Sequence, residues 1–397
     1  MNTDTEPDPL APRQSIPRGV WVLGFVSMFM DISSEMIHSL LPVFIVSVLG
    51  GSVFIVGLIE GVGESTAMIV KVISGVLSDR MRHRKYFAVL GYALGTLSKP
   101  IFALAASTGW VLVARFADRI GKGIRGAPRD ALIADLTPKE IRGAAYGLRQ
   151  ALDTVGAFLG PMLAIILMLA LADNFRLVFW CAVIPGVLAV LLLAAGIKEP
   201  QHLRAEPRPV LSLQPATLKQ FKPDFWRVVI IGAVFSLARF SEAFLVLRAT
   251  DLGLPITYAP AVLITMNVVF ALCAYPLGKL ADRVRHEGLL AAGLVVLLIA
   301  DLLFAHAQGL VLVFSGIAVW GVYLGMTQGL LSTMIAGAAP VALRGTAFGI
   351  FNLVSGLALL VASVVAGLLW DSYGPAVTFY AGAILATLTL LILLTKR

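Results

Sequence analysis

The stretch Gly75-Val-Leu-Ser-Asp-Arg-Met-Arg-His-Arg-Lys85 decides the architecture of this chain, because the chain contains a second copy of it. The first copy ends one apolar segment and precedes another that begins at Tyr86. The second copy is Gly278-Lys-Leu-Ala-Asp-Arg-Val-Arg-His286, and its glycine lies 203 positions after Gly75. A different motif keeps almost the same spacing, since Arg142-Gly-Ala-Ala-Tyr-Gly147 returns 202 positions later as Arg344-Gly-Thr-Ala-Phe-Gly349. Two unrelated motifs that recur after almost the same number of residues indicate that one half of the chain is a duplicate of the other.

The composition indicates a membrane protein. Of the 397 residues, 58% are hydrophobic and only 14% are charged, whereas a soluble chain carries about a quarter charged residues. The net charge of +8 fits basic loops beside a membrane better than a nucleic-acid surface, so no nucleic-acid partner is expected. Cys181 and Cys273 both lie in apolar runs, which argues against a disulfide framework or a thiolate metal site.

The apolar runs predict twelve membrane-spanning helices, since a span needs about 20 apolar residues. The expected fold class is an all-α membrane protein of two pseudo-symmetric six-helix bundles, at residues 18–197 and 225–397. Residues 1–17 are expected to form a disordered cytoplasmic tail, and residues 198–224 a solvated linker. The twelve predicted spans are 20–49, 53–77, 86–107, 110–136, 144–171, 175–197, 225–252, 259–281, 289–306, 310–339, 346–370 and 375–394.

Orientation follows from the positions of Lys and Arg. One set of turns is basic at residues 80–85, at Lys139 and Arg142, in the linker, and at Arg283, Arg285 and Arg344, whereas the alternate turns carry almost no charge. Basic turns stay in the cytoplasm. Both termini are therefore expected to be cytoplasmic, in a multi-pass protein of the bacterial inner membrane.

The Gly-x-Leu-x-Asp-Arg turn, its second copy and the twelve spans together resemble the major facilitator superfamily (MFS). This resemblance implies two halves that rock about a central cavity, with the substrate site at the midplane. The first turn departs from the usual pattern, since Arg82 or His83 stands where a glycine is usual. In this family such turns latch the cytoplasmic side closed, with Arg142 and Arg344 as natural partners of the turn carboxylates. The gating residues expected from the turns are Gly75, Asp79, Arg80, Arg142, Gly278, Asp282, Arg283 and Arg344.

The fifth span resembles that of proton-coupled exporters in its glycine spacing. Gly147, Gly156 and Gly160-Pro161 match this "antiporter" motif, although Ala164 and Ile165 replace the paired glycines that usually follow. Physically, glycines allow helices to approach closely and Pro161 allows a bend, so Gly156, Gly160 and Pro161 join the expected gating residues. In the fourth span Arg119-Ile-Gly-Lys-Gly123 is similar to the Arg-x-x-Gln-Gly motif of the same exporters, with Lys122 in place of the glutamine.

Ionisable side chains at membrane depth indicate function, because they are costly unless paired or hydrated. The fourth span carries four of them in a single helical stripe, at Asp118, Lys122, Arg125 and Arg129. Asp31 and Glu35 in the first span lie one helical turn apart, and Ser34-Glu35 returns as Ser241-Glu242. The candidate proton- or substrate-binding residues are Asp31, Glu35, Glu60, Glu64, Arg119, Lys122, Arg125, Arg149, Asp153, Arg239 and Glu242.

Two interpretations of these charges remain open. In one, a carboxylate among Asp31, Glu35, Glu60 and Glu64 takes up and releases a coupling proton, since burial favours the neutral form and a nearby Arg119 or Lys122 favours the charged form. In the other, the charges form fixed ion pairs that hold helices together. The cations of the fourth span favour an anionic or zwitterionic substrate, because Arg binds carboxylate and phosphate with two parallel hydrogen bonds.

These observations predict a secondary transporter that exports a small anionic or amphiphilic compound in exchange for protons. The alternatives are uptake of an organic anion and, less favoured, efflux of a transition metal bound by Asp31, Glu35 and His38. Asn267, Gln328 and Asn352 either line the cavity or make interhelical hydrogen bonds. No nucleophile–base pair or nucleotide-binding loop appears, so neither an enzyme nor a cofactor is expected. A monomer would suffice.

Overall fold

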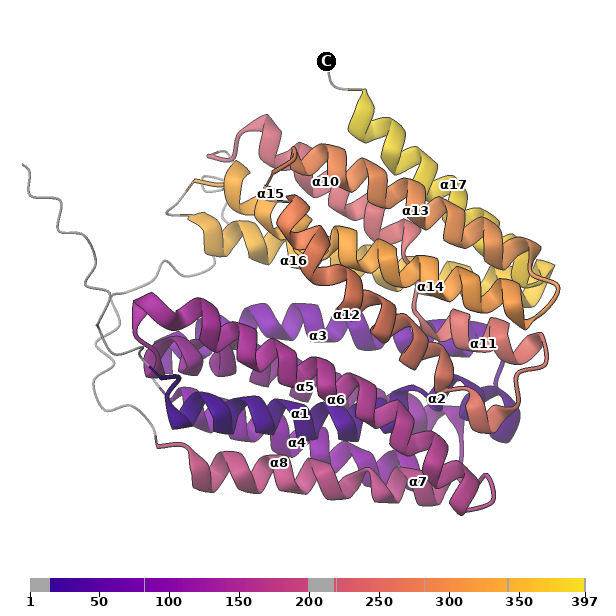
Figure 1. Cartoon of the computed structure of the whole chain (residues 1–397), viewed down its shortest axis with the longest axis horizontal. Helices are drawn as coiled ribbons and strands as arrows, with labels where there is room; N and C mark the ends of the chain where they lie inside the picture. Colours follow the sequence, from indigo (N-terminus) through magenta and orange to yellow (C-terminus); the bar gives the residue numbers. More distant parts are fainter. Residues whose placement is uncertain are drawn as a thin grey trace, which may run out of the picture.

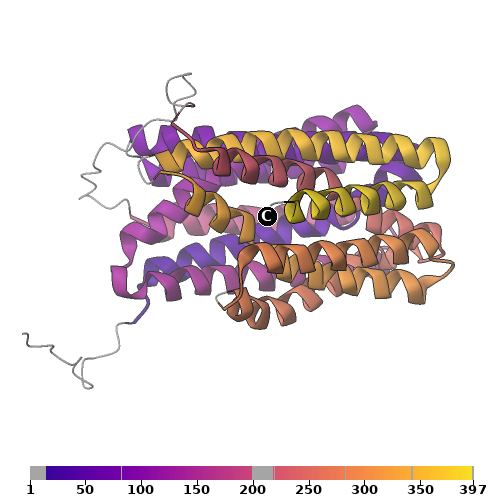
Figure 2. The ribbon, with the colours of Figure 1, turned by 90° about the horizontal axis from the view of Figure 1, so that it is seen from above.

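A computed structural model describes residues 15–81, 83–198, 218, 220–281, 283–340 and 343–395, apart from the side chains of Asp79, Arg80, Met81 and Lys139. Most of the predicted tail and linker, together with Asp282, lie outside the described residues. The described chain forms two helical bundles that lie against each other along their length, with the first half below the second in Figure 1. Figure 2 shows the same helices from above, running roughly along the longest axis of the molecule.

The first bundle contains the segments up to the linker. Its elements are α1 (Arg18–His38), α2 (Leu41–Val43), the π-helical turn η1 (Phe44–Val48), α3 (Val53–Met81), α4 (Arg84–Leu104), α5 (Thr108–Leu136), η2 (Lys139–Ile141), α6 (Arg142–Ala170), α7 (Phe175–Cys181) and α8 (Val183–Gly196). The second bundle follows the same order. Its elements are α10 (Pro223–Ala238), α11 (Ala243–Asp251), η3 (Ile256–Tyr258), α12 (Ala261–Ala281), α13 (His286–His306), α14 (Leu310–Thr327), α15 (Leu330–Ala338), α16 (Arg344–Tyr373) and α17 (Pro375–Leu394).

Eleven helical segments of the described chain are long and apolar enough to cross a membrane. The one predicted span that is not among these eleven, residues 110–136, corresponds to α5. This helix has 29 residues, as many as α3 and α6, but carries charges along one face. A helix of this length spans the hydrocarbon only if those charges face protein or water. The structure meets this condition, because Arg115, Asp118, Arg119 and Arg125 of α5 are buried within the bundle.

The duplicated motifs occupy equivalent places in the two bundles. Gly75 lies near the end of α3 and Gly278 near the end of α12, whereas Arg142 and Arg344 are the first residues of α6 and α16. These four helices form the seam between the bundles, where α3 packs against α16 and α6 packs against α12. The internal repeat therefore specifies a pseudo-symmetric contact between the halves.

The bundles meet at one end of the molecule, which we call the closed end. It carries the loops at residues 50–52, 171–174 and 252–255. The largest apolar cluster joins both bundles here and includes Phe44 and Phe244, on either side of the contact between α2 and α11. Asp371 at the end of α16 accepts hydrogen bonds from the backbone N–H groups of Val53 and Phe54, and Thr257 donates to Asp173 at 2.6 Å.

The opposite end, which carries the basic turns, is the open end. Here the apolar core divides into two separate clusters, one in each bundle. Val20, Leu132 and Leu193 belong to the cluster of the first bundle, whereas Phe225 and Ile335 belong to that of the second. Because the described residues form no shared apolar core at this end, the space between the bundles can be occupied by water.

Candidate functional site

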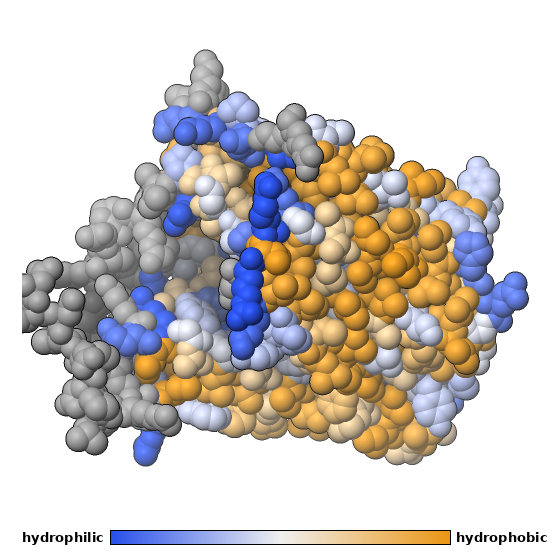
Figure 3. Space-filling model, turned by 45° about the horizontal axis from the view of Figure 1, so that its top comes forward, coloured by the Kyte–Doolittle hydropathy of each residue, from blue (hydrophilic) through white to orange (hydrophobic). Residues whose placement is uncertain are grey.

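Two adjoining cavities lie between the bundles, and Figure 3 shows the surface hollowed beside its apolar band. The first, which we call the charged compartment, has a volume of about 390 Å³ and lies mainly against the first bundle. The second, the aromatic compartment, has a volume of about 360 Å³ and lies mainly against the second bundle. Both are lined by Met68, Asn267 and Phe270, so they form one continuous region.

Eight ionisable residues line the charged compartment. They are Asp31, Glu35, Glu64, Lys71, Lys122, Arg125, Arg129 and Asp153. The four cations are matched by four carboxylates, so the excess of positive charge that the sequence suggests for α5 does not extend to the cavity wall as a whole. Uptake of a single proton by one carboxylate would leave this wall positively charged.

Behind this wall, a network of buried ion pairs fixes α5 to its neighbours. Glu60 accepts from Arg115 at 2.6 Å, and both side chains are almost fully buried. Arg119 lies 3.0 Å from Glu64, and Lys99 of α4 donates to Asp118 at 2.8 Å. Buried charges are tolerated when they are paired and hydrogen-bonded in this way. Glu60, Glu64 and Asp118 are therefore structural members of a network, whatever further role they have.

Asp31, Glu35 and Lys122 differ from this network. All three line the charged compartment, and the Lys122 side chain is exposed to it. Within the described part of the chain, none of the three forms an ion pair within 4.0 Å. Asp153, in contrast, is held by Arg149 at 2.5 Å. The two carboxylates of α1 are thus the acids of this cavity that are accessible and not committed to a partner.

Two glycines of α6 position the carboxylates of α1. A Cβ atom at Gly156 would lie 2.6 Å from the backbone oxygen of Met28, and one at Gly160 would lie 2.7 Å from Cβ of Glu35. Any side chain at either position would separate α6 from α1. The expected close approach is therefore present at Gly156 and Gly160, whereas a Cβ at Gly147 would meet nothing within 4 Å. Pro161 is buried within α6.

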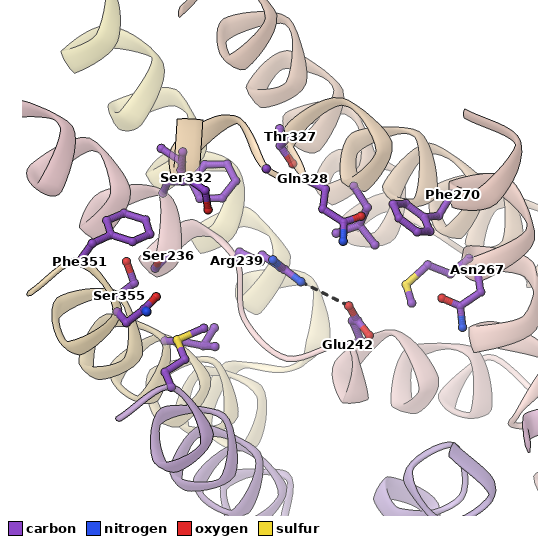
Figure 4. Close-up of a pocket in the computed structure, with 18 residues that line it drawn as sticks. Ser236, Arg239, Glu242, Asn267, Phe270, Thr327, Gln328, Ser332, Phe351 and Ser355 are labelled. Atoms are coloured by element: carbon purple, nitrogen blue, oxygen red, sulfur yellow. Dashed lines mark ion pairs between the residues drawn. The ribbon is translucent and has the colours of Figure 1, made fainter. Parts of the chain in front are cut away.

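The aromatic compartment is built around an interruption of the seventh span. Helix α10 ends at Ala238 and α11 begins at Ala243, and the intervening segment carries Arg239 and Glu242, which pair at 3.6 Å. Figure 4 shows this pair between the ring of Phe351 and the side chains of Gln328 and Asn267. The tenth span is also interrupted, since Gly329 adopts a left-handed conformation with φ of 83° between α14 and α15. Asn267, Gln328 and Asn352 all line this compartment.

The Ser241 side chain connects this interruption to the network of the first bundle. The Ser241 hydroxyl donates to Oε2 of Glu60 at 3.4 Å, the same oxygen that accepts from Arg115. Rearrangement of the interrupted span would therefore change the hydrogen bonding of Glu60, which is paired with Arg115.

The transition-metal alternative finds no support in the described residues, which contain no group of three His, Cys, Asp and Glu side chains placed to hold a metal ion. Nδ1 of His38 accepts hydrogen bonds from the guanidinium groups of Arg115 and Arg119, at 2.9 and 3.2 Å. That nitrogen is therefore occupied by donors.

The sequence profile of the Major Facilitator Superfamily matches residues 23–362 and 243–397, which together cover nearly the whole chain. The chain belongs to the Major Facilitator Superfamily. An uncharacterised MFS-type transporter of Methanocaldococcus jannaschii is 34% identical over 393 residues, covering 96% of this chain and 95% of that one. The inner membrane transport protein YajR of Escherichia coli is 24% identical, covering 96% and 83%. Among solved structures, that of the nucleoside transporter NupG has a TM-score of 0.79 at 13% identity, covering 94% of this chain and 98% of that chain, which shows a common fold.

Within this MFS transporter, the motif residues expected to act as a gate lie at the open end. Gly75 is packed close to Ala127, whereas Gly278 has open space around it, and Arg283 is exposed. Arg142 and Arg344 donate to the carbonyl oxygens of Thr137 and Ala336. Their expected partners, the side chain of Asp79 and Asp282, lie outside the described part, and so does the side chain of Arg80, so the proposed latch stays a prediction.

Three buried ionisable residues of the described chain were missed from the sequence. Lys99 of α4 is 1% exposed, Asp301 of α13 is fully buried, and Arg248 of α11 is 6% exposed. Lys99 and Asp301 each interrupt an otherwise apolar span, which is the same signal that identified Asp31 and Glu64. They are harder to recognise because neither has a second charge of its span at helical spacing.

Proposed function

We propose that this MFS protein is a secondary active transporter that exports a small amphiphilic compound bearing an anionic group, in exchange for protons. The observation that carries the proposal is the pair of uncommitted carboxylates, Asp31 and Glu35, in a cavity that is closed at one end and also holds Lys122, a cation without an ion pair in the described chain. The structure corresponds to one state of an alternating-access cycle, with the cavity open towards the basic turns. The positive-inside rule makes that side the cytoplasm, in an inner membrane with both termini inside.

The two compartments fit a substrate that has an anionic group at one end and an apolar group at the other. The Lys122 ammonium offers a charge partner for a carboxylate or phosphate group. The rings of Phe235, Phe270 and Phe351, together with amides and hydroxyls of α12 to α16, offer an apolar surface with a few hydrogen-bonding positions. Binding sites of this size typically combine an apolar lining with a small number of placed polar groups.

Exchange for protons requires that substrate and proton compete. A carboxylate of α1 cannot hold a proton and accept a charged donor group of the substrate at the same time. We therefore place a hydrogen-bond donor of the substrate at Asp31 or Glu35, and its anionic group at Lys122. Protonation of the carboxylate then releases the substrate, and substrate binding from the cytoplasm releases the proton. The exporter-like spacing of Gly147, Gly156, Gly160 and Pro161 in α6 agrees with this direction.

The second candidate is proton-coupled uptake of an organic anion, which the uncommitted Lys122 favours. An anion without a donor group would neutralise Lys122 and so favour the protonated carboxylate. Proton and substrate would then bind together and move in the same direction. The sign of the coupling therefore depends on whether the substrate competes with the proton for Asp31 and Glu35.

Transport in proteoliposomes tests both candidates. A thermal-shift screen of the purified protein against organic anions, zwitterions, cations and metal ions first identifies a ligand, since ligands stabilise the folded state by mass action. A pH gradient, acidic outside, then drives export in the first candidate and uptake in the second. Asp31→Asn or Glu35→Gln should abolish the response to the gradient while retaining substrate exchange, whereas Glu64→Gln, at a residue held by Arg119, serves as the comparison. If both α1 variants keep full coupling, the proposed proton site is wrong.

A further inference from the structure

Asp301 lies in the second bundle, away from both compartments. Its side chain is fully buried in α13, and neither carboxylate oxygen has a hydrogen-bond partner. The neighbouring helices leave it little space, since a Cβ atom at Gly382 of α17 would lie 2.8 Å from Oδ2 and 2.9 Å from the ring of Phe240. An ionised carboxylate in such a place, with no cation and no donor, is far less stable than a neutral one.

The surroundings of Asp301 are aromatic. Phe304, one turn further along α13, stacks on Phe379 at 4.9 Å and packs against Trp320 at 6.3 Å between ring centroids. Phe240 contacts both Trp320 and Phe379, at 5.9 and 5.6 Å. Such rings exclude water and offer no acceptor for a cation. The chamber therefore fits a neutral carboxylic acid and does not fit a metal ion.

The titratable groups that face Asp301 are few. Helix α17 contains no Asp, Glu, Lys or Arg. From α14, the buried Tyr323 packs against Trp320 at 5.7 Å between ring centroids, and its hydroxyl has no hydrogen-bond partner within the described chain. His306 of α13 is exposed and bonds to Tyr380. From α11, the Arg248 guanidinium group donates to the carbonyl oxygens of Phe304 and Ala307 at 3.2 and 2.8 Å and pairs with Asp251, so this cation is already committed to other partners.

Phe240 links this chamber to the interruption of the seventh span. Its ring faces the Asp301 chamber, while the preceding residue, Arg239, lines the aromatic compartment and pairs with Glu242. A change in the backbone between α10 and α11 would move both residues together. It would therefore open the aromatic wall that the Phe240 ring contributes to the chamber.

We propose that Asp301 is a proton-binding site of the second bundle, which holds its proton in the state seen here and releases it when the segment from Arg239 to Glu242 rearranges. The site is separate from the carboxylates of α1 and does not depend on the substrate or the direction of transport.

Infrared difference spectroscopy on the full-length protein in lipid bilayers tests this directly. At neutral pH, the spectrum of the unaltered protein minus that of Asp301→Asn should contain the C=O stretch of one protonated carboxylic acid. Glu140→Gln, at an exposed glutamate of the first bundle, should leave that band unchanged. Gly382→Ala should shift the same band without removing it, because the added methyl group would lie against Oδ2.

A difference spectrum that contains only bands of an ionised carboxylate, or no carboxyl band at all, would overturn the proposal. The measurement needs no substrate and no gradient. A negative result here would therefore leave the antiport proposal intact, and full coupling in the α1 variants would leave the Asp301 proposal intact.

Discussion

One oxygen of Asp371 accepts the backbone N–H of Phe54 at 2.8 Å, and the other accepts that of Val53 at 3.1 Å. Asp371 ends α16 of the second bundle, whereas Phe54 begins α3 of the first. The first turn of a helix has N–H groups without partners inside the helix, and it attracts negative charge. The carboxylate of one bundle thus caps a helix of the other, at the closed end.

Replacing this cap should favour the state in which the closed end opens. Loss of a helix cap costs about 1 kcal/mol, so we expect Asp371→Ala to raise the population of that state roughly fivefold. The measurement is the rate at which an impermeant maleimide labels a cysteine placed at Ser363, which is 1% exposed at the seam, with Cys181 and Cys273 replaced. Asp251→Ala is the matched control, because Asp251 pairs within its own bundle. Equal labelling rates in the two variants would contradict a latch at Asp371.

Gly160 should be far more sensitive to substitution than Gly147 in the same helix. A methyl group at Gly160 would lie 2.7 Å from Glu35 Cβ and 2.9 Å from the Ile32 oxygen, and overpacking of this kind costs about 1–3 kcal/mol. Gly147→Ala meets nothing and should stabilise the helix by up to about 1 kcal/mol. Thermal unfolding in detergent compares the two variants. A Gly160→Ala protein as stable as the Gly147→Ala protein would show that α6 and α1 do not need this close contact.

Glu60 and Glu64 should differ in their contribution to stability, although both are carboxylates of α3. Glu60→Ala leaves Arg115 buried without its 2.6 Å partner, and breaking a buried pair from one side costs about 3–5 kcal/mol. The double variant Glu60→Leu with Arg115→Leu should recover much of this loss. Glu64 is 29% exposed on its side chain, so Glu64→Ala should cost less than Glu60→Ala. Chemical denaturation of the four proteins orders them, and a Glu64 effect as large as that of Glu60 would count against the distinction.

Lys122 should determine the response to anionic ligands. We expect Lys122→Gln to lose at least tenfold in affinity for any organic anion that stabilises the unaltered protein, because Lys122 is exposed to the charged compartment and has no ion-pair partner there. Lys279→Gln is the matched control, since Lys279 is an exposed lysine of α12 that lies outside both compartments. Ligand titrations followed by thermal shift give both affinities. Equal affinities in the two variants would place the anionic group elsewhere.

Much of the fold can be predicted from the sequence, because a bilayer imposes a simple rule. Backbone groups must be satisfied within each span, so a run of about 20 apolar residues is a helix wherever it occurs. The repeat of the Gly75 turn at Gly278 then predicts the pairing of the halves. The rule counts apolar residues and therefore supports α5 less strongly than the other spans. Two buried cations of α5 are stabilised in the membrane because they pair with Glu60 and Glu64 of α3 and with Asp118 of α5 itself.

The candidate site can be predicted only in part. The spacing of charges identifies Asp31, Glu35, Glu64 and Lys122 as interior residues, since exposure to lipid would be too costly. Sequence spacing cannot tell which of them are paired. That depends on distances between helices, and these are set by contacts such as Gly160 against Glu35.

The sequence by itself determined that this chain spans a membrane in two related halves and keeps ionised side chains away from lipid, since each of these follows from transfer energies that depend on residue type alone. The tertiary structure decided which charges are bound to one another and which remain free. It also decided that the seventh span breaks at Arg239–Glu242, that Asp301 is enclosed by rings, and that the cavity is closed at Asp371 and Phe54. Such properties depend on the relative positions of helices that are far apart in the sequence, and these positions cannot be predicted from a local sequence pattern.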